Sequence, residues 1–410
     1  MTLGAAGAEE TTGTARPEEA VGTPSAGTTG AGGAALYRAD ADGGPRPPDW
    51  ARRPADAIRA AAPRTGAVAV ALRQGGRRAI VTYGSTSHHG GIPVTADTRF
   101  EIGSLTKCFT ALLLAEQVAR GELAYGDPLA RFLPPEALPR PRGGAITPLH
   151  LATHTSGLPR LPPGLLGNAA ADWFSNPYAH FATADLLRAL AGTRPHARPG
   201  ERVRYSNFGV GLLGHLLTRA APGGRLGYGD LLAARVLGPL GLSRTSCGPD
   251  LPQATGYWHG RARPPWLIPG LAGAGAVRSS ARDLLGLLDA VLDTAPDVPS
   301  GSGPSAPVPV PVSGTVPLPV TLRTALVDVV RPRLALRGGG KRLALIWNIR
   351  LRPDGDVYHH SGGTRGFSAF AGFSPRHRTA LVALTNTSPT AGQTFIQSAY
   401  DALLSLARPV

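Results

Sequence analysis

Ser104 and Lys107 are the two residues whose types and spacing most clearly permit chemistry. They lie in the segment 103–107, Gly-Ser-Leu-Thr-Lys, which opens a mostly apolar run. If that run is helical, side chains three residues apart share one face, so the hydroxyl can pass its proton to the amine. Apolar neighbours would lower the pKa of the lysine by desolvation and make it a base near neutral pH. The alternative is a serine N-cap followed by an exposed lysine.

A second group of polar side chains is Tyr205, Ser206 and Asn207. If this triplet is extended, Tyr205 and Asn207 project to the same side. A phenol beside a lysine can relay protons to a leaving group, and an amide offers a donor and an acceptor to a substrate amide. Because a helix is expected over 210–217, an N-cap role for Ser206 or Asn207 is the alternative.

The segment 360–363, His-Ser-Gly-Gly, forms a third group at the end of a predicted strand. Strand alternation puts His360 and Gly362 on one face. Gly362 and Gly363 carry no side chain, so they leave that edge open for a substrate backbone. The alternative is a turn between strands with a solvent-exposed histidine.

Three other features suggest chemistry and have simpler explanations. His150 and His154 are four residues apart, as zinc ligands on a helix would be, but the glutamate of H-E-x-x-H is missing, so no metal site is predicted. Cys108 borders the same helical face as Ser104, and an inert buried thiol is the expected interpretation. Trp258 and Trp266 either line a cleft or simply pack.

The apolar patterns predict the elements that must position these groups. The predicted elements are a hairpin of strands 67–72 and 79–83, a buried helix 110–120, strands 343–347, 357–361, 367–373 and 379–385, and a last helix 394–406. Strands at both chain ends around a helical middle predict an α+β fold. Its antiparallel sheet is built from both ends of the chain and flanked by helices, with an inserted, mostly helical lobe.

Composition sets the domain boundaries. Residues 1–48 lack hydrophobic periodicity and are predicted to be a disordered tail, followed by one folded domain over 49–410. The helical lobe should span about 125–292, and the Pro-rich stretch 295–320 should be a loop. No apolar run is long enough for a membrane span, and two cysteines exclude a disulfide scaffold.

The formal net charge of +15 does not predict nucleic-acid binding. Nearly all of the 42 basic residues are arginines scattered along the chain, with no basic helix or aromatic-interleaved stripe. The first residues contain neither a basic nor an apolar signal-peptide region, so a cytoplasmic location is expected, or a secreted one if the start codon is misassigned.

Together and in this order, the three groups resemble the serine β-lactamase and penicillin-binding-protein superfamily, in particular its class C β-lactamase, DD-carboxypeptidase and esterase branch. Further segments that are similar to this superfamily are 100–103, 121–128, 146–158, 273–283 and 360–367. The resemblance begins near residue 67 and extends to the C-terminus, interrupted by the Pro-rich stretch.

The resemblance implies a β-lactamase/transpeptidase-like fold and a serine hydrolase that works through an acyl-enzyme without a cofactor. Ser104 would be the acylated nucleophile, Lys107 its general base, and Tyr205 would share proton transfer and protonate the leaving group. The residues implied in substrate binding are Asn207, His360, Gly362 and Gly363. The backbone amides of Ser104 and Gly363 would form the oxyanion hole. The expected partner is a small-molecule or peptide acyl substrate, such as an ester, an amide or a β-lactam.

One departure affects the expected substrate. His360 stands where many β-lactamases have a lysine, and a neutral histidine is a poorer anchor for a substrate carboxylate. Two alternatives stay open: an acyltransferase, transacylase or peptide cyclase that uses the same acyl-enzyme, and a non-catalytic penicillin-binding or sensor module. The intact Ser104, Lys107 and Tyr205 favour catalysis. The oligomeric state is open.

Overall fold

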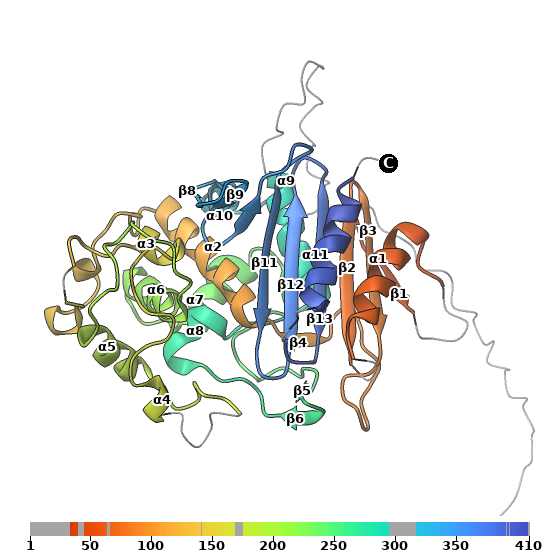
Figure 1. The fold of residues 1–410 in the computed structure, drawn as a ribbon, viewed down its shortest axis with the longest axis horizontal. Helices are drawn as coiled ribbons and strands as arrows, with labels where there is room; N and C mark the ends of the chain where they lie inside the picture. Colours follow the sequence, from red (N-terminus) through yellow and green to blue (C-terminus); the bar gives the residue numbers. More distant parts are fainter. Residues whose placement is uncertain are drawn as a thin grey trace, which may run out of the picture. The chain divides into compact units, whose positions relative to one another are not determined.

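The fold is seen in a computed structural model that describes residues 33–39, 45–63, 66–140, 142–168, 175–294, 317–390, 392 and 394–408 (Figure 1). Its centre is a nine-stranded sheet in the order β1-β3-β2-β13-β12-β11-β10-β9-β8. The strands are β1 (Ala35–Arg38), β2 (Val68–Gln74), β3 (Arg77–Tyr83), β8 (Leu334–Ala335), β9 (Lys341–Leu343), β10 (Asn348–Arg350), β11 (Val357–Gly363), β12 (Ser368–Ser374) and β13 (Thr379–Thr385).

Strands from the two ends of the chain meet where β2 pairs with β13. This pair is antiparallel and puts Val70 opposite Ala383. The sheet is mixed rather than purely antiparallel, because β1 at its edge pairs in parallel with β3. Two small sheets lie outside it, and their strands are β4 (Arg99–Glu101) with β7 (Arg278–Ser280), and β5 (Gly256–Trp258) with β6 (Arg261–Arg263).

Helices cover both faces of the sheet. In Figure 1, α1 (Asp49–Ala60) and α11 (Thr394–Leu406) lie in front of it and α9 (Ala281–Thr294) lies behind. The period of two along β2 matches this arrangement: Val68, Val70 and Leu72 pack into the cluster with α1 and α11, whereas the alternating alanines face the other cluster. With both faces covered, β2 is apolar over its first five residues, which explains the continuous hydrophobic run that ends at Leu72.

A mostly helical lobe lies beside the sheet (Figure 1). Its helices are α3 (Pro148–Ala152), α4 (Leu165–Asn168), α5 (Thr183–Ala191), α6 (Asn207–Ala220), α7 (Tyr228–Leu232) and α8 (Ala272–Gly275). Short turns join the elements: η1 (Gly103–Leu105), η2 (Leu129–Arg131), η3 (Pro135–Ala137), the π-helical η4 (Ala233–Leu237) and η5 (Pro269–Leu271).

The helix α2 (Thr106–Ala119) connects the two parts. It packs against α10 (Val320–Val329) on one side and against α6 and α8 on the other, so residues 106–117 are all buried. That burial explains why its sequence is apolar nearly all round. The helix begins four residues earlier than predicted, and the turn η1 directly precedes it. Ser104 in this turn therefore lies where the sheet and the lobe meet.

The fold class is confirmed, and four details of the prediction are corrected. The disordered tail predicted over 1–48 falls mainly outside the described residues, but β1 (Ala35–Arg38) lies within it and is ordered. The segment 343–347 turns between β9 and β10, with Ile346 at φ +67°, instead of forming one strand. The helix α9, most of which falls within the lobe predicted over 125–292, packs against β2 and β13 of the sheet. Most of the Pro-rich segment lies outside the described residues, and α10 begins at its last position, Val320.

None of the helices in the described part of the chain has the length and hydropathy needed to cross a bilayer.

Candidate active site

Ser104 and Lys107 come together at the start of α2. Ser104 lies in the turn η1 and Lys107 in the first turn of the helix. The Lys107 Nζ is 2.9 Å from the Ser104 Oγ. The three-residue spacing therefore brings the amine to the hydroxyl, as the sequence predicts. The alternative of a serine N-cap with an exposed lysine is wrong, since Lys107 is fully buried.

The environment of Lys107 favours its neutral form. Its amine donates a hydrogen bond of 2.7 Å to the carbonyl oxygen of Ala274 in α8. Burial, with a smaller contribution from the positive charge of Arg160, lowers the pKa of Lys107 from 10.5 to about 7. A large fraction of the amine is therefore unprotonated near neutral pH, which a general base requires.

Tyr205 is the second side chain on the serine. Its hydroxyl donates a hydrogen bond of 2.6 Å to the Ser104 Oγ. Burial raises the pKa of Tyr205 to about 12, so the phenol keeps its proton at neutral pH. The Lys107 Nζ lies 5.0 Å from the centre of the Tyr205 ring and the exposed guanidinium of Arg160 lies 5.5 Å from it. A single hydroxyl thus contacts both a base and an acid.

Asn207 is the first residue of α6, and its neighbour Ser206 is the N-cap. The Ser206 Oγ accepts a hydrogen bond of 2.8 Å from the Gly209 amide, so the N-cap alternative holds for Ser206. The Asn207 Nδ2 donates to the Tyr178 hydroxyl at 3.3 Å. Its Oδ1 is buried and finds no hydrogen-bond partner among the described residues. Asn207 therefore offers an acceptor near Tyr205.

The end of β11 packs directly on the turn that holds Ser104. A Cβ on Gly362 would lie 2.0 Å from the Ile102 carbonyl oxygen and 2.7 Å from the Ser104 backbone nitrogen. A Cβ on Gly103, which has φ +48°, would lie 2.5 Å from the Gly363 carbonyl oxygen. Because only glycine allows this approach, the strand edge and the backbone of Ser104 lie in direct contact.

His360 lies on β11 in the interior and not in solvent. Its side chain is 5% exposed, and its Nδ1 has no hydrogen-bond partner in the described part of the chain. Burial and the nearby Lys107 and His154 lower the pKa of His360 to about 3. The residue at the usual lysine position is therefore uncharged at neutral pH.

Aromatic and arginine side chains form the rim of the site. Trp266 packs on Tyr178, with ring centres 5.5 Å apart, and the Arg365 guanidinium lies 4.9 Å from the centre of the Trp258 ring. Burial raises the pKa of Tyr178, and both Arg160 and Arg365 oppose that rise, so two cations flank this tyrosine. Trp266 thus packs on the tyrosine that contacts Asn207, whereas Trp258 contacts Arg365, which the sequence alone does not place and which supplies a positive charge near Tyr178.

The remaining candidates have other surroundings. The His150 Nδ1 pairs with the Thr147 Oγ1 at 3.1 Å, whereas the His154 Nδ1 accepts from the Ser206 amide at 3.3 Å, so the two rings have different partners. No group of three or more metal-binding side chains occurs among the residues that the structure describes. Cys108 is buried and burial raises its thiol pKa, which is typical of an inert thiol.

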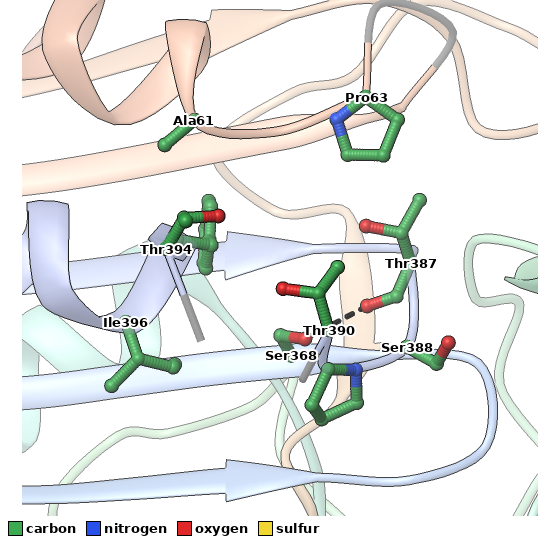
Figure 2. A pocket seen from close by; sticks show the side chains of 10 residues that line it. Ala61, Pro63, Ser368, Thr387, Ser388, Thr390, Thr394 and Ile396 are labelled. Atoms are coloured by element: carbon green, nitrogen blue, oxygen red, sulfur yellow. Dashed lines mark hydrogen bonds between the residues drawn. The ribbon is translucent and has the colours of Figure 1, made fainter. Parts of the chain in front are cut away.

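Two cavities lie away from Ser104. Figure 2 shows a hollow of about 20 Å³ between the end of α1, the Ser368 end of β12 and the start of α11, where the Ser368 Oγ donates to the Thr387 carbonyl oxygen at 2.9 Å. A volume of this size holds about one water molecule. A larger cavity of about 260 Å³ lies in the lobe and is lined by His215, Tyr228 and several glycines. Ser104 lines neither of them.

Sequence reasoning missed some neighbours of Ser104, Lys107 and Tyr205. The Ala274 carbonyl oxygen is a backbone atom, so no residue type announces it. Arg160 and Tyr178 come from loops of the lobe whose course is set by packing. The sequence pattern suggests His154 only as a metal ligand, whereas the structure places it beside Tyr205, with ring centres 4.7 Å apart.

Comparisons with known proteins show which family this chain resembles. The sequence profile of the beta-lactamase family matches residues 53–405. A beta-lactamase of Providencia stuartii is 27% identical over 78% of this chain and 82% of its own length. The D-alanyl-D-alanine-carboxypeptidase/endopeptidase AmpH of Escherichia coli strain K12 is 32% identical over 45% of this chain and 46% of its length. Esterase EstB of Burkholderia gladioli is 32% identical over 48% of this chain and 52% of its length.

Two of the curated relatives, a beta-lactamase and AmpH, both of Escherichia coli, are matched over less than half of their own length. Solved structures share the fold over a longer stretch. A beta-lactamase/D-alanine carboxypeptidase of Pseudomonas syringae superimposes with a TM-score of 0.68 at 23% identity, over 88% of this chain and 99% of that one. A class C beta lactamase of Rhodobacter sphaeroides gives a TM-score of 0.69 at 24% identity, over 88% and 100%. With the family profile spanning most of its length, the chain belongs to the beta-lactamase family.

Proposed function

We propose that this protein is a serine hydrolase that cleaves ester or amide acyl substrates through an acyl-enzyme on Ser104. One observation supports the proposal above all others: the Ser104 Oγ lies 2.9 Å from the buried Lys107 amine and accepts a hydrogen bond of 2.6 Å from the Tyr205 phenol. A nucleophile within reach of a base, with a proton donor on the same atom, is the arrangement that covalent catalysis requires.

In the acylation step, the neutral Lys107 amine accepts the Ser104 hydroxyl proton as the Oγ attacks the acyl carbon. The new C–O bond gives a tetrahedral intermediate with a negative oxygen. The bond to the leaving group then breaks, and the proton passes from Lys107 through the Tyr205 hydroxyl to the departing atom. The lowered pKa of Lys107, about 7, suits both the uptake and the release of this proton.

Deacylation repeats the same proton transfers with water as the nucleophile. The water loses a proton to the neutral Lys107 amine while its oxygen attacks the carbonyl carbon of the acyl-enzyme ester. The bond to the Ser104 Oγ then breaks, and the proton returns from Lys107 through the Tyr205 hydroxyl to this oxygen. The product acid departs and the resting enzyme returns. The lysine and the tyrosine therefore act twice in each turnover.

Backbone amides beside Ser104 are proposed to stabilise the negative oxygen. The close approach of β11 to η1 brings the backbone of Gly362 and Gly363 to that of Ser104, which supports a pair of amide donors on this edge. Losing one such donor typically costs about 3 kcal/mol of transition-state stabilisation. Asn207 would orient the acyl group, with a buried Oδ1 that has no partner among the described residues.

The charge at His360 favours esters and amides over β-lactams. Because the pKa of His360 is about 3, the ring is neutral at neutral pH and provides no ammonium for a β-lactam carboxylate. The names of the relatives include beta-lactamase as well as carboxypeptidase/endopeptidase and esterase, so the preference rests on the charge at position 360.

Intact-mass spectrometry of the protein mixed with esters, D-alanyl peptides and β-lactams tests the proposal. We expect a mass increase equal to the acyl group that decays as product acid forms, and none with Ser104→Ala, whose folding is checked by circular dichroism. A complete lack of adduct across the panel would refute the proposal and favour a binding module. A long-lived adduct that an added amine releases faster than water does would assign acyl transfer instead.

A further inference from the structure

His154 combines burial with an unusual backbone conformation. It follows α3, is 5% exposed and has φ +57°. A left-handed conformation costs a residue with a side chain free energy, and it persists where the surrounding contacts enforce it. The contacts of His154 therefore indicate what this conformation is for.

His154 holds the backbone on both sides of Tyr205. Its carbonyl oxygen accepts a hydrogen bond of 2.8 Å from the Arg204 amide. Its Nδ1 accepts one of 3.3 Å from the Ser206 amide. The residue between these two amides is Tyr205, and its ring packs on the imidazole with centres 4.7 Å apart. One residue thus fixes both the backbone and the ring of the tyrosine.

The left-handed backbone makes these contacts compatible. It lets the carbonyl oxygen and the ring of His154 reach the amides of Arg204 and Ser206, one on each side of Tyr205. The Tyr205 hydroxyl at the far end of the ring then donates to the Ser104 Oγ at 2.6 Å. A shift of the tyrosine by a fraction of an ångström would lengthen this bond, and hydrogen bonds weaken steeply as their geometry worsens.

We propose that His154 is a positioning residue for Tyr205, which holds the phenol hydroxyl on the Ser104 Oγ. The inference rests on the proposed function, because the phenol matters only if acyl transfer uses it. His154 itself takes no proton in the reaction and acts through the tyrosine.

The chemistry of the ring fits this role. Since Nδ1 accepts a hydrogen bond, the proton of the neutral ring is on Nε2. Burial and the nearby Lys107 lower the pKa of His154 to about 3, so the ring stays neutral and Nδ1 stays an acceptor at any working pH. Phenylalanine would keep a ring but lose the acceptor. Asparagine tolerates a left-handed backbone and carries an oxygen that can accept from the Ser206 amide.

His150 provides a matched control on the same segment. It lies four residues earlier and is half-buried, and its Nδ1 pairs with the Thr147 Oγ1 at 3.1 Å. His150 takes no part in the hydrogen bonds or ring contacts that hold Tyr205. His150→Asn therefore repeats the chemical change of His154→Asn without touching the tyrosine.

A double-mutant cycle tests the proposal with the acylation rate of an activated ester as the measurement. We expect His154→Phe to slow acylation by about tenfold or more, and Tyr205→Phe by about 100-fold. In the Tyr205→Phe background, His154→Phe should cause less than about a twofold further loss, because the hydroxyl that it positions is already gone. His154→Asn should remain within about threefold of the wild type, as should His150→Asn.

The cycle separates two kinds of failure. If His154→Phe slows acylation by the same factor in both backgrounds, His154 acts independently of Tyr205 and the inference is wrong while the proposed function stands. If Tyr205→Phe leaves acylation unchanged, the role of the phenol in the proposed function fails and the inference fails with it. Should His154→Phe not fold, His154→Gly, which suits φ +57°, replaces it in the same cycle.

Discussion

Lys107 and Ala274 are 167 residues apart in the chain, and the Lys107 amine donates a hydrogen bond of 2.7 Å to the Ala274 carbonyl oxygen. A neutral amine has two hydrogens and one lone pair. With one hydrogen on Ala274, the lone pair can turn to the Ser104 hydroxyl 2.9 Å away. Helix α8 therefore orients the Lys107 amine toward Ser104.

Lys107→Arg should abolish acylation although it keeps a positive charge. Arginine stays protonated at any working pH, so it cannot accept the Ser104 proton. We expect a loss of at least about 1,000-fold in the acylation rate, measured by single-turnover kinetics with an activated ester. Activity within about tenfold of the wild type would remove the lysine from the base role. Lys341→Arg, at the other lysine of the chain and exposed on β9, is the control and should leave the rate unchanged.

Gly362→Ala should block the site by sterics. Its Cβ would lie 2.0 Å from the Ile102 carbonyl oxygen, so β11 and the turn η1 would have to separate. We expect a loss of acylation and a lower melting temperature. Gly76→Ala is the control, because a Cβ there meets no atom within 4 Å. A Gly362→Ala variant that is acylated as fast as the wild type would show that the close approach of the strand is dispensable.

His360→Lys should shift the substrate preference toward anions. An ammonium at this position would attract a substrate carboxylate, which the neutral imidazole does not. The ratio of kcat/KM for a carboxylate-bearing β-lactam to that for a neutral ester should rise by about tenfold, equivalent to about 1.4 kcal/mol. His359→Lys is the matched control, since His359 packs on the other side of β11 against Tyr400. An equal ratio in both variants would mean that position 360 does not read the substrate charge.

Removing a tyrosine hydroxyl should slow turnover at position 205 but not at position 83. Tyr205→Phe removes the hydroxyl that donates to Ser104, and we expect turnover of a neutral ester to fall by about 100-fold or more. Tyr83→Phe on β3 removes a hydroxyl that donates to Asp56, far from the reaction, and should leave turnover unchanged. Steady-state kinetics on both variants compares them. Equal turnover in the two would exclude the phenol from proton transfer.

Local patterns predicted the elements whose sequence determines their shape. The hairpin of β2 and β3, the strands β11 to β13 and the helix α11 (Thr394–Leu406) agree with the prediction because their apolar residues repeat at the period of the element. The spacing of Ser104 and Lys107 also required only local geometry. The turn η1 and the first turn of α2 bring the two side chains together.

The errors occurred where tertiary contacts override local patterns. The apolar segment 343–347 is buried although it is not one continuous strand. Its Ile346 amide donates a hydrogen bond of 2.9 Å to the Ala152 carbonyl oxygen, a contact with the lobe that the local sequence does not reveal. The strand β1 (Ala35–Arg38) has only four residues, and its pairing with β3 gives no periodic signal in a Gly-rich region. Likewise, no sequence pattern links Lys107 to Ala274 or His154 to the amides around Tyr205.

The pH dependence of Ser104 acylation reports the protonation state of Lys107 in the intact protein. Because burial lowers the pKa of Lys107 to about 7 and only the neutral amine accepts a proton, the single-turnover rate should rise with pH, reach half its maximum near 7 and level off above it. The phenol, with a pKa of about 12, adds no fall below pH 10. A rate that is flat from pH 6 to 9, or one that is half-maximal near the ordinary lysine value of 10.5, would show that Lys107 is not the neutral base of Ser104.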